Sequence, residues 1–495
     1  MHFTDPVAAL LSCVLALVFV IKIINRWKSD KYKNFPPGPR PLPIIGNLHI
    51  LNLKRPYLTL LKLSKEYGSV FSVHIGLQKT VVLAGYETVR DALVNHAEEF
   101  SERAHIPLFQ KTSKGNGVIF SHGENWKVMR RFTLTALRDF GMGKRTIEDK
   151  IKEECESLLK NIETYQGKPF DNTTIMNAAV ANIIVSIVLG HRYDYEDKTF
   201  LRLLSLINEN FRLSASPMAS LFNMYPTLFG FIPGDHKMMV KNVREIQTFI
   251  RTTFVEHLKD LDRNDQRSLI DAFLVRQQEE KPDPHIYFHD ENLTCLVSHL
   301  FAAGMETTST TLRWGLLLMI KYPEIQENVQ KEIDRVMGST KPQTEHRRHM
   351  SYTDAVIHEV QRFANILPMS LPHETTMDVQ FKGYFIPKDT YVIPLLSSVL
   401  NDQAHFERPE EFNPQHFLDS DGKFLKKEAF IPFSAGRRVC AGENLAKMEL
   451  FIFFTSLLQK FTFSSPADVT HVDISPGVGF TVPPLPHRIC AVPRY

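Results

Sequence analysis

Residues 433–442 read Phe-Ser-Ala-Gly-Arg-Arg-Val-Cys-Ala-Gly, and this stretch decides how the rest of the chain is interpreted. Gly436 and Gly442 allow a tight loop whose backbone can approach a partner closely. Cys440 follows two arginines and precedes a helix expected to begin near Glu443. Positive charge and a helix N-terminus both favour the thiolate form of a cysteine. A lone cysteine in such a loop is more often structural than reactive, so the loop by itself leaves both roles open.

The longest segment with helical periodicity carries Gly304. It is expected to begin at Asp290 as N-cap and to end at Lys321, just before Tyr322-Pro323. Its length and its apolar character on several faces predict that it crosses the interior. A glycine inside a helix costs about 1 kcal/mol relative to alanine. A side-chain-free surface over a flat cofactor would explain it.

The spacing FxxGxRxCxG, formed by Phe433, Gly436, Arg438, Cys440 and Gly442, resembles the haem-binding loop of the cytochrome P450 superfamily. In that family the cysteine is the axial iron ligand, and its thiolate pushes electron density toward the iron. The resemblance therefore implies haem b as cofactor, Cys440 as metal ligand and Phe433 beside the cofactor. It covers essentially the whole chain and most resembles family 2 of the microsomal vertebrate enzymes, in particular the fish subfamily K.

Glu359-Val-Gln-Arg362 matches the family's ExxR pair. On a helix this spacing places both side chains on one face, within reach of an ion pair. Alone, such a pair is more typical of a solvated surface. The resemblance makes it a buried structural pair joined by a later loop, where this chain has His416 and many members have arginine.

The segment from Ala303 to Thr307 matches the family's oxygen-activating signature. The resemblance makes Thr307 and Glu306 the catalytic residues. Thr307 would manage proton delivery, and Glu306 would relay protons through water. Gly304 is expected to lie against the cofactor. Without the other motifs, the same residues would also suit an ordinary packed helix.

Further residues fall where related members hold the haem propionates. Trp126 and Arg130 match the family's WxxxR helix, and arginine suits carboxylates through its planar fork. Arg103, His373 and Arg438 complete the set that the resemblance implies. It also places five apolar side chains in the substrate pocket, although each equally suits plain core: Phe120, Ala303, Leu367, Leu371 and Phe480.

Residues 7–24, VAALLSCVLALVFVIKII, form an apolar run with a single charge, Lys22. Most of them are Val, Leu, Ile or Phe, each favouring membrane insertion by roughly 0.3–0.6 kcal/mol. Positive residues follow the run rather than precede it, which favours an anchor over a cleaved signal peptide and keeps the following domain cytosolic. We expect a membrane anchor over residues 1–25, a basic and Pro-rich linker over 26–43, and a catalytic domain over 44–495.

The periodicity elsewhere predicts a mainly α protein with a smaller β part, an α+β class, and the resemblance makes this the cytochrome P450 fold. Predicted strands cover residues 70–75, 80–83, 379–385 and 391–395, with a short helix near 88–94. The clearest further helices cover residues 147–162, 237–258 and 323–336, and one helix follows Cys440.

Composition excludes two classes. The net charge is only +3, and the sequence contains no basic tract interleaved with aromatic residues, which sets nucleic-acid binding aside. The five cysteines are odd in number and scattered, which fits neither a disulfide framework nor a CxxC zinc site. The catalytic domain is therefore expected in a reducing compartment.

The resemblance implies NADPH-dependent insertion of one atom of dioxygen into lipophilic substrates such as fatty acids, steroids or xenobiotics. NADPH acts indirectly, because the chain lacks a GxGxxG nucleotide domain. The implied partners are NADPH–cytochrome P450 reductase, optionally a b-type cytochrome, and the endoplasmic reticulum membrane. A basic docking face for the reductase is expected from residues near the cysteine loop and the WxxxR helix: Lys127, Arg131, Arg138, Lys144, Arg145 and Arg437.

Two other functions stay open from the sequence. One is a haem-dependent isomerase or dehydratase that uses no dioxygen. The other is a membrane lipophile-binding or haem-sensing protein without turnover. The Glu306-Thr307 pair favours the oxygenase over the first, and oxygen consumption would distinguish them.

Overall fold

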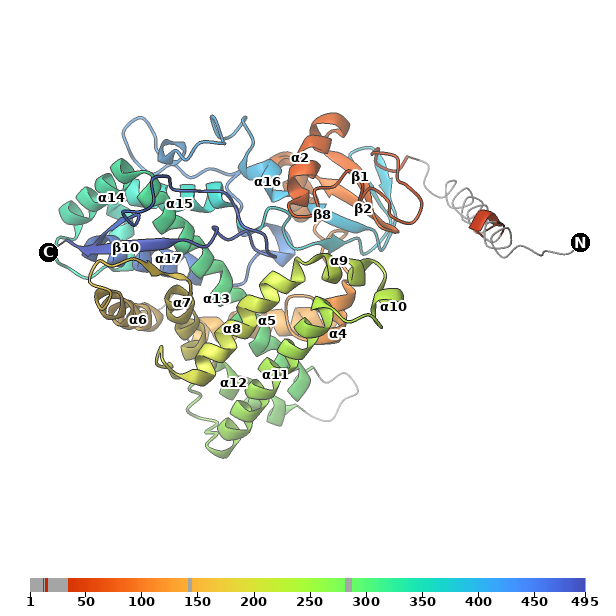
Figure 1. Cartoon of the computed structure of the whole chain (residues 1–495). Helices are drawn as coiled ribbons and strands as arrows, with labels where there is room; N and C mark the ends of the chain where they lie inside the picture. Colours follow the sequence, from red (N-terminus) through yellow and green to blue (C-terminus); the bar gives the residue numbers. More distant parts are fainter. Residues whose placement is uncertain (1–11, 13, 17–33, 141–144, 281–286, 495) are drawn as a thin grey trace, which may run out of the picture.

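The computed structural model describes residues 12, 14–16, 34–140, 145–280 and 287–494. The protein is mainly helical with a smaller β part, which confirms the predicted class. The largest sheet lies at one end of the molecule and most helices lie at the other, with the C-terminus at the far side of the helical part (Figure 1).

Helix α13 (Asp290–Lys321) passes through the middle of the helical part and packs against α7 (Thr173–Val188), α11 (Asp235–Lys259) and α17 (Glu443–Lys460) (Figure 1). From Met305 to Met319 every side chain except that of Thr307 is buried. A helix apolar on several faces must be enclosed, as the sequence predicted. Its N-cap is His289, whose ring nitrogen accepts from Asn292, rather than Asp290, which is the first helical residue.

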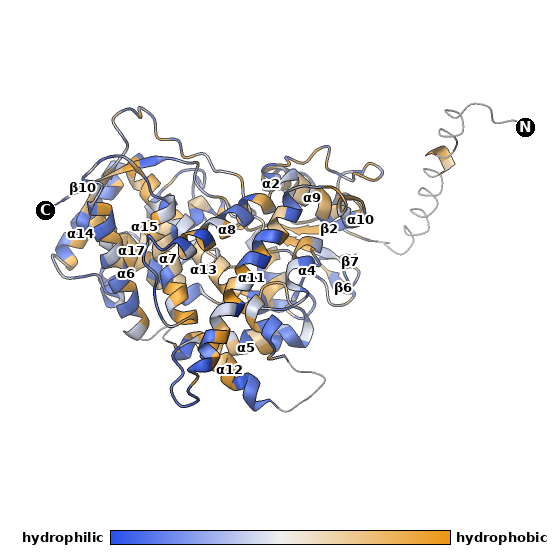
Figure 2. Ribbon diagram, turned by 60° about the horizontal axis from the view of Figure 1, so that its bottom comes forward, coloured by the Kyte–Doolittle hydropathy of each residue, from blue (hydrophilic) through white to orange (hydrophobic). Residues whose placement is uncertain are grey.

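The outer helices are amphipathic. In α8 (Lys198–Ser214) and α11 hydrophilic residues alternate with hydrophobic ones at helical spacing, and the hydrophobic ones face the molecule's interior (Figure 2). Leu203, Leu206 and Ile207 of α8 are almost completely buried against this interior. These helices therefore close the core from outside.

The five-stranded sheet has the order β1-β2-β8-β5-β3. Strands β2 and β8 pair in parallel, and the other neighbours are antiparallel. The register of the last pair places Arg103 opposite His373. Residues that are far apart in the sequence are thus joined at one edge of the sheet. The strands are β1 (Val70–Ile75), β2 (Gln78–Leu83), β3 (Glu102–Arg103), β5 (His373–Glu374) and β8 (Tyr391–Pro394).

The strand-like segment over residues 379–385 does form strands, but it contains a turn. The segment forms a hairpin of β6 (Val379–Phe381) and β7 (Tyr384–Ile386). Lys382 and Gly383 both have positive φ, 51° and 83°. Two successive positive φ angles make a tight two-residue hairpin turn, and a lysine at the first position is not its usual signal.

The remaining sheet joins β4 (Phe170–Asp171), β10 (Arg488–Pro493) and β9 (Phe461–Ser464). The remaining helical segments are α2 (Pro56–Tyr67), α3 (Tyr86–Arg90), the π-helix η2 (Asp91–Asn95), α4 (Pro107–Ser113), α5 (Gly123–Asp139), α6 (Arg145–Glu163), α9 (Pro217–Met224), α10 (Pro226–Phe229), α12 (Leu269–Glu279), α14 (Pro323–Val336), η3 (Thr344–His349), α15 (Ser351–Ala364), α16 (Leu396–Leu400), η4 (Pro414–Phe417) and η5 (Gly436–Arg438).

The expected membrane anchor lies almost entirely outside the described residues. Within the part of the chain that the structure describes, no helix combines the length and the apolar character needed to cross a bilayer.

Candidate functional site

The loop before α17 holds Cys440 at its end. Gly436 has φ of +74°, and a Cβ atom there would lie 1.8 Å from the carbonyl oxygen of Leu93 in η2, so glycine is required. The Cys440 amide donates to the carbonyl oxygen of Phe433 at 3.1 Å. The Cys440 thiol is free and exposed, whereas the other three described cysteines are buried. The loop therefore presents a thiol that a metal could bind.

The two arginines before Cys440 do not act on its thiol as the sequence predicted. Arg437 pairs with Glu98 at 3.6 Å, and Arg438 turns to Glu102 at 2.8 Å. Desolvation raises the pKa of Cys440, and the backbone amide of Gly442 at the start of α17 and the Arg130 guanidinium only partly offset this rise. The thiolate would instead come from metal coordination, which deprotonates a thiol outright.

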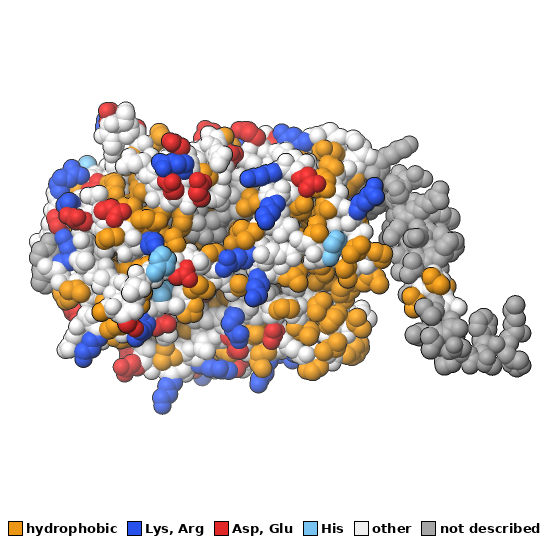
Figure 3. Space-filling model, turned by 45° about the horizontal axis from the view of Figure 1, so that its top comes forward, with side chains coloured by type: hydrophobic (Ala, Val, Ile, Leu, Met, Phe, Trp, Pro, Cys, Tyr) orange, Lys and Arg blue, Asp and Glu red, His pale blue; other side chains and the backbone are white. Residues whose placement is uncertain are grey.

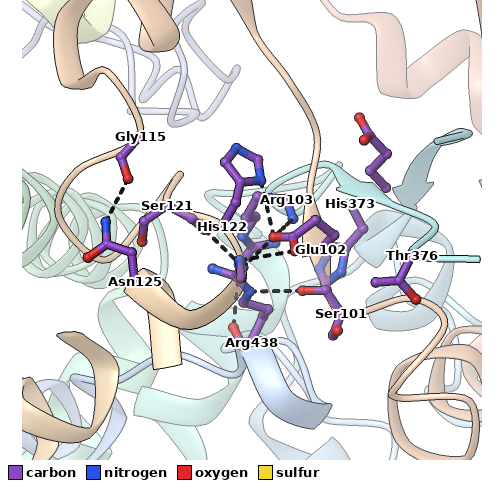
Figure 4. Close-up of polar contacts among 12 residues, drawn as sticks. Ser101, Glu102, Arg103, Gly115, Ser121, His122, Asn125, His373, Thr376 and Arg438 are labelled. Atoms are coloured by element: carbon purple, nitrogen blue, oxygen red, sulfur yellow. Dashed lines mark hydrogen bonds and ion pairs between the residues drawn. The ribbon is translucent and has the colours of Figure 1, made fainter. Parts of the chain in front are cut away.

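Four buried nitrogens beside this loop have no hydrogen-bond partner among the described residues: Arg103 Nε, Trp126 Nε1, His373 Nε2 and Arg438 Nη1. The Arg438 guanidinium lies 3.8 Å from the Trp126 ring centroid, and Arg103 donates to the Arg438 carbonyl oxygen at 3.4 Å. Figure 4 shows Arg103, His373 and Arg438 gathered around Glu102. A buried unpaired donor costs roughly 1–3 kcal/mol. Several of them together indicate a site for an acceptor group.

The charges of this cluster favour an anionic acceptor. Burial, with repulsion from neighbouring arginines, lowers the pKa of Arg103 and of Arg438 to about 9. Burial also holds the pKa of His373 well below its usual range, and its Nδ1 donates to the Phe100 carbonyl oxygen at 2.6 Å. A carboxylate beside these groups would relieve the repulsion and favour a protonated His373 that donates through Nε2. The donor set fits the propionates of a haem.

Arg130, the second residue of the WxxxR motif, lies on α5 close to the cysteine loop. Its Nη2 donates to the Val439 carbonyl oxygen at 2.6 Å. This contact fixes the backbone immediately before Cys440. Arg130 thus joins α5 to the loop, while Trp126 on the same helix faces Arg438.

On α13, Thr307 and Glu306 point to different surroundings. The Thr307 hydroxyl donates to the Ala303 carbonyl oxygen at 2.7 Å, which leaves its oxygen free as an acceptor. Glu306 is buried and accepts from Thr481 at 2.7 Å and Thr310 at 3.3 Å. Burial raises the pKa of Glu306. Glu306 therefore lies in an internal polar cluster with Thr481 and Thr310, and its part in the expected proton relay stays a prediction.

Gly304 does not present an open surface as the sequence suggested. A Cβ atom at Gly304 would lie 2.5 Å from Cδ1 of Ile184 in α7. The side-chain-free position therefore allows close packing of α13 against α7. The expectation that Gly304 lies open against a flat cofactor is corrected by this contact.

The ExxR pair is completely buried and fully bonded. Arg362 makes two bonds of 2.7 Å to the two carboxylate oxygens of Glu359. Its other donors reach the carbonyl oxygens of Leu400, Pro409 and Glu411. His416 Nδ1 lies 3.2 Å from both Glu359 oxygens. In this chain a histidine occupies the third position of the cluster.

An aromatic group brings together two of the predicted pocket residues. Phe120 stacks on Phe109 of α4 with centroids 4.1 Å apart, and Phe480 meets Phe109 edge-on at 6.0 Å. Phe211 of α8 contacts Phe480 at 5.9 Å. The sequence missed Phe109 and Phe211, because only the folded chain brings α4 and α8 beside the C-terminal segment.

The other predicted pocket residues are half-buried at separate positions. Ala303 lies on α13 one turn before Thr307. Leu367 and Leu371 lie between α15 and β5, where the Leu371 carbonyl oxygen accepts from Arg103 at 3.0 Å. This last contact connects the segment to the cluster of unpartnered nitrogens. Phe433, in the cysteine loop, has the Lys447 ammonium 5.7 Å from its ring centroid.

Comparison with known proteins adds independent information. A family model described as "Cytochrome P450" matches residues 36–491. Cytochrome P450 2K4 of Oncorhynchus mykiss is 50% identical over 496 residues, which cover 99% of this chain and 98% of that protein. Cytochrome P450 2K6 of Danio rerio is 47% identical over 494 residues, covering 99% and 98%. Cytochrome P450 2C23 of Rattus norvegicus is 46% identical over 480 residues, covering 96% and 97%.

Proposed function

This chain belongs to the cytochrome P450 family, among its family 2 members, and is a haem monooxygenase; from this premise we propose how its own residues serve that activity. The proposal is an NADPH-dependent monooxygenase that inserts one oxygen atom into lipophilic substrates, with electrons from a separate reductase. The observation that carries it is the exposed Cys440 thiol beside four buried, unpartnered nitrogens.

When bound, haem supplies the binding and activation of dioxygen at its iron. Cys440 would bind the haem iron through its thiolate. Trp126, Arg103, His373 and Arg438 would hold the propionates, and Arg130 fixes the backbone next to Cys440. A fixed shell of this kind limits how the ligand and the cofactor can move.

Thr307 would hold a proton or a water molecule at the reacting group. Because its own hydrogen is committed to Ala303, its oxygen can accept a bond from a water molecule or from a reacting group. Thr307 is also the one side chain between Met305 and Met319 that is not buried. Glu306 is buried one residue away, burial raises its pKa, and it is the second member of the proposed pair.

The substrate is lipophilic because the side chains near α13 are aromatic and apolar. Phe109, Phe120, Phe211 and Phe480 come from four different segments and converge on one another. Such walls bind fatty acids, steroids or foreign aromatic compounds by shape, with about 1–3 kcal/mol per methylene.

The reductase docks on the basic surface around α5. Lys127, Arg131 and Arg138 are exposed on this helix, and Arg437 is exposed in the cysteine loop. Lys127 and Arg437 pair with Glu124 and Glu98, so their charge is partly neutralised. Lys144 and the side chain of Arg145 lie outside the described residues. Charge reversal at Arg131 and Arg138 should slow reductase-supported turnover in a salt-dependent way, while peroxide-supported turnover survives.

We expect two parts of the chain to contact the membrane: the apolar N-terminal run and an apolar end patch. The end patch is formed by residues 42–45, Leu77 and residues 228–232. The patch exposes Leu42, Ile44, Leu77, Leu228 and Phe231. The Tyr225 hydroxyl donates to the Ile44 carbonyl oxygen at 2.6 Å, which joins two of these segments. Hydrophobic side chains gather toward the end of the molecule where β1 and β2 lie (Figure 3). Large exposed apolar patches mark contact surfaces, which supports contact of this end with a membrane; the proposed anchor is residues 1–25 and the proposed membrane is that of the endoplasmic reticulum.

Reconstitution with NADPH–cytochrome P450 reductase in vesicles tests this function. We expect NADPH- and oxygen-dependent products from a mixed panel of fatty acids, steroids and aromatic xenobiotics, identified by mass spectrometry. The Cys440→Ser variant is the matched control, because it keeps the size of the side chain. Product formation without dioxygen would instead indicate an isomerase or dehydratase, and ligand-induced spectral shifts without any product would indicate a sensor.

A further inference from the structure

Glu102 lies behind the propionate-binding arginine and has no role in the function proposed above. Its side chain is only 22% exposed, and it belongs to the two-residue strand β3 next to Arg103. Its Oε1 atom accepts from Arg438 Nη2 at 2.8 Å and lies 3.1 Å from His122 Nδ1. Figure 4 shows Glu102 between Arg438 and His122.

The bonds of Arg438 leave only one nitrogen for a ligand. Nε donates to the Ser101 carbonyl oxygen at 2.9 Å, and Nη2 donates to Ser121 at 3.0 Å as well as to Glu102. Nη1 is buried and has no partner among the described residues. These three contacts fix the guanidinium plane and the direction of Nη1, and Glu102 supplies the charged one among them.

Glu102 is itself held from several sides. The backbone amides of Arg103 and of Gly123, at the start of α5, donate to its two oxygens at 3.2 and 3.3 Å. His122 stacks on His105 with centroids 4.2 Å apart, and His105 Nδ1 lies 3.1 Å from Glu374. These contacts give the carboxylate a fixed position, and the helix N-terminus favours its negative charge.

We propose that Glu102 is a positioning residue that aims Arg438 Nη1 at a haem propionate and, through its negative charge, lowers the reduction potential of the haem. The inference rests on the proposed haem site. A fixed anion near the haem disfavours the ferrous state, which carries one positive charge fewer than the ferric state, so loss of the anion favours reduction. Three neighbouring cations, Arg103, Arg130 and Arg438, otherwise act in the opposite direction.

Glu98, which lies shortly before Glu102 in the sequence, offers a matched control. Glu98 pairs with Arg437 at 3.6 Å, and these two side chains are 71% and 46% exposed. Both carboxylates therefore bind an arginine of the same loop, but only Glu102 reaches the buried one. An exposed pair such as Glu98–Arg437 is screened by water and contributes little electrostatic free energy.

The experiment compares purified wild-type holoenzyme with Glu102→Gln, Glu102→Asp and Glu98→Gln. Redox titration should show that the equilibrium constant for reduction of the ferric haem is at least threefold higher in Glu102→Gln than in wild type. This corresponds to a reduction potential about 30 mV higher for a one-electron step. The constant should be nearly unchanged in Glu98→Gln and closer to wild type in Glu102→Asp, which restores the charge. Resonance Raman spectra of the ferric protein should show a shifted propionate band in Glu102→Gln only.

Equal equilibrium constants and equal propionate bands in Glu102→Gln and Glu98→Gln would overturn the inference. So would a Glu102→Asp variant that behaves like Glu102→Gln, because packing rather than charge would then matter. The ferrous–carbon monoxide spectrum of each protein separates the two levels of the argument. A wild-type protein without the thiolate-type Soret band would refute the proposed function and this inference with it, whereas an intact band with unchanged potentials refutes Glu102 alone.

Discussion

Two buried arginine clusters in this protein differ in how far the protein itself satisfies them. Around Arg362, Glu359 and three carbonyl groups accept from every guanidinium nitrogen. Around Arg438 and Arg103, one nitrogen of each guanidinium and the Trp126 Nε1–H have no acceptor among the described residues, and His373 Nε2 has no partner there either.

The difference separates a structural cluster from a binding cluster. Buried polar groups are bonded in the great majority of cases, so a group of unpartnered donors calls for an explanation. A cluster that is complete without a ligand stabilises the fold. A cluster that is completed only by an anion stabilises the bound anion. We therefore expect mutations in the Arg362 cluster to lower the stability of the fold and mutations in the Arg438 cluster to weaken retention of the haem.

The largest effect is expected from Arg362→Ala. It leaves the Glu359 carboxylate buried without its guanidinium partner, which costs roughly 3–5 kcal/mol of unfolding free energy. Urea unfolding followed by circular dichroism measures this, or the variant fails to accumulate as folded protein. Arg408→Ala is the control, because Arg408 pairs with Glu411 at 2.9 Å on the surface; its loss should be about 1 kcal/mol or less. Equal costs would remove the distinction between the clusters.

Glu449 is a second buried carboxyl group, and unlike Glu359 it has no arginine bonded to it among the described residues. Burial raises the pKa of Glu449 in α17 from 4.5 to about 8, and its Oε1 has no partner among the described residues. The folded protein therefore holds an extra proton between about pH 4.5 and pH 8, and stability falls as the pH rises through that window. Glu449→Gln should remove this loss, worth roughly 3–5 kcal/mol near pH 8.5.

Thermal unfolding at pH 5 and pH 8.5 checks the prediction for Glu449. Glu443→Gln, at the half-buried start of the same helix where Glu443 pairs with Lys447, should leave the pH dependence as it is in wild type. If Glu449→Gln and wild type lose stability in parallel between the two pH values, the carboxyl is not held protonated by burial.

The same substitution, tryptophan to phenylalanine, can be compared at Trp126, whose Nε1–H has no partner among the described residues, and at Trp314, whose Nε1–H is bonded. Trp126→Phe removes an unpartnered Nε1–H, so it should speed transfer of haem to apomyoglobin about tenfold, as expected for roughly 1.5 kcal/mol of a charged hydrogen bond. Trp314 Nε1 already donates to the Val482 carbonyl oxygen at 2.9 Å. Trp314→Phe should lower thermal stability and leave haem transfer unchanged. The account fails here if both variants release haem at the same rate.

Much of the site was predictable because several of its parts are local in sequence. The cysteine loop, the ExxR pair and the Thr307 segment each occupy a few consecutive residues, and the resemblance assigned them together. The pairing of Arg103 with His373 depends on the register of β3 against β5, which no local pattern contains.

Other features followed only from the fold. The resemblance assigned Arg362 to a structural pair and Arg438 to the propionates, but their partners include distant carbonyl groups, so the sequence alone could not reveal which donors stay unpartnered. The same holds for Gly304, whose neighbour Ile184 lies on another helix, and for Arg437, which turns away to Glu98. Backbone torsion explains the missed hairpin at Lys382.

The smallest effect on stability is expected from Thr307→Ala. Thr307 and Thr311 make the same bond to the carbonyl group four residues earlier, at 2.7 and 2.8 Å, but Thr311 is buried and Thr307 is not. Thr307→Ala should keep haem and stability while the ratio of product to NADPH falls several-fold and hydrogen peroxide rises. Thr311→Ala should keep that ratio. Simultaneous assay of product, peroxide and NADPH measures it, and an unchanged ratio in Thr307→Ala would make Thr307 a packing residue.

The most direct measurement is the ferrous–carbon monoxide spectrum of the wild-type protein and of Cys440→Ser. The account predicts the red-shifted Soret band of thiolate ligation in wild type and its loss in Cys440→Ser, with haem still partly retained by Arg103, Trp126 and Arg438. A Cys440→Ser protein that binds haem and keeps the same red-shifted band would contradict the assignment of Cys440 as the metal ligand.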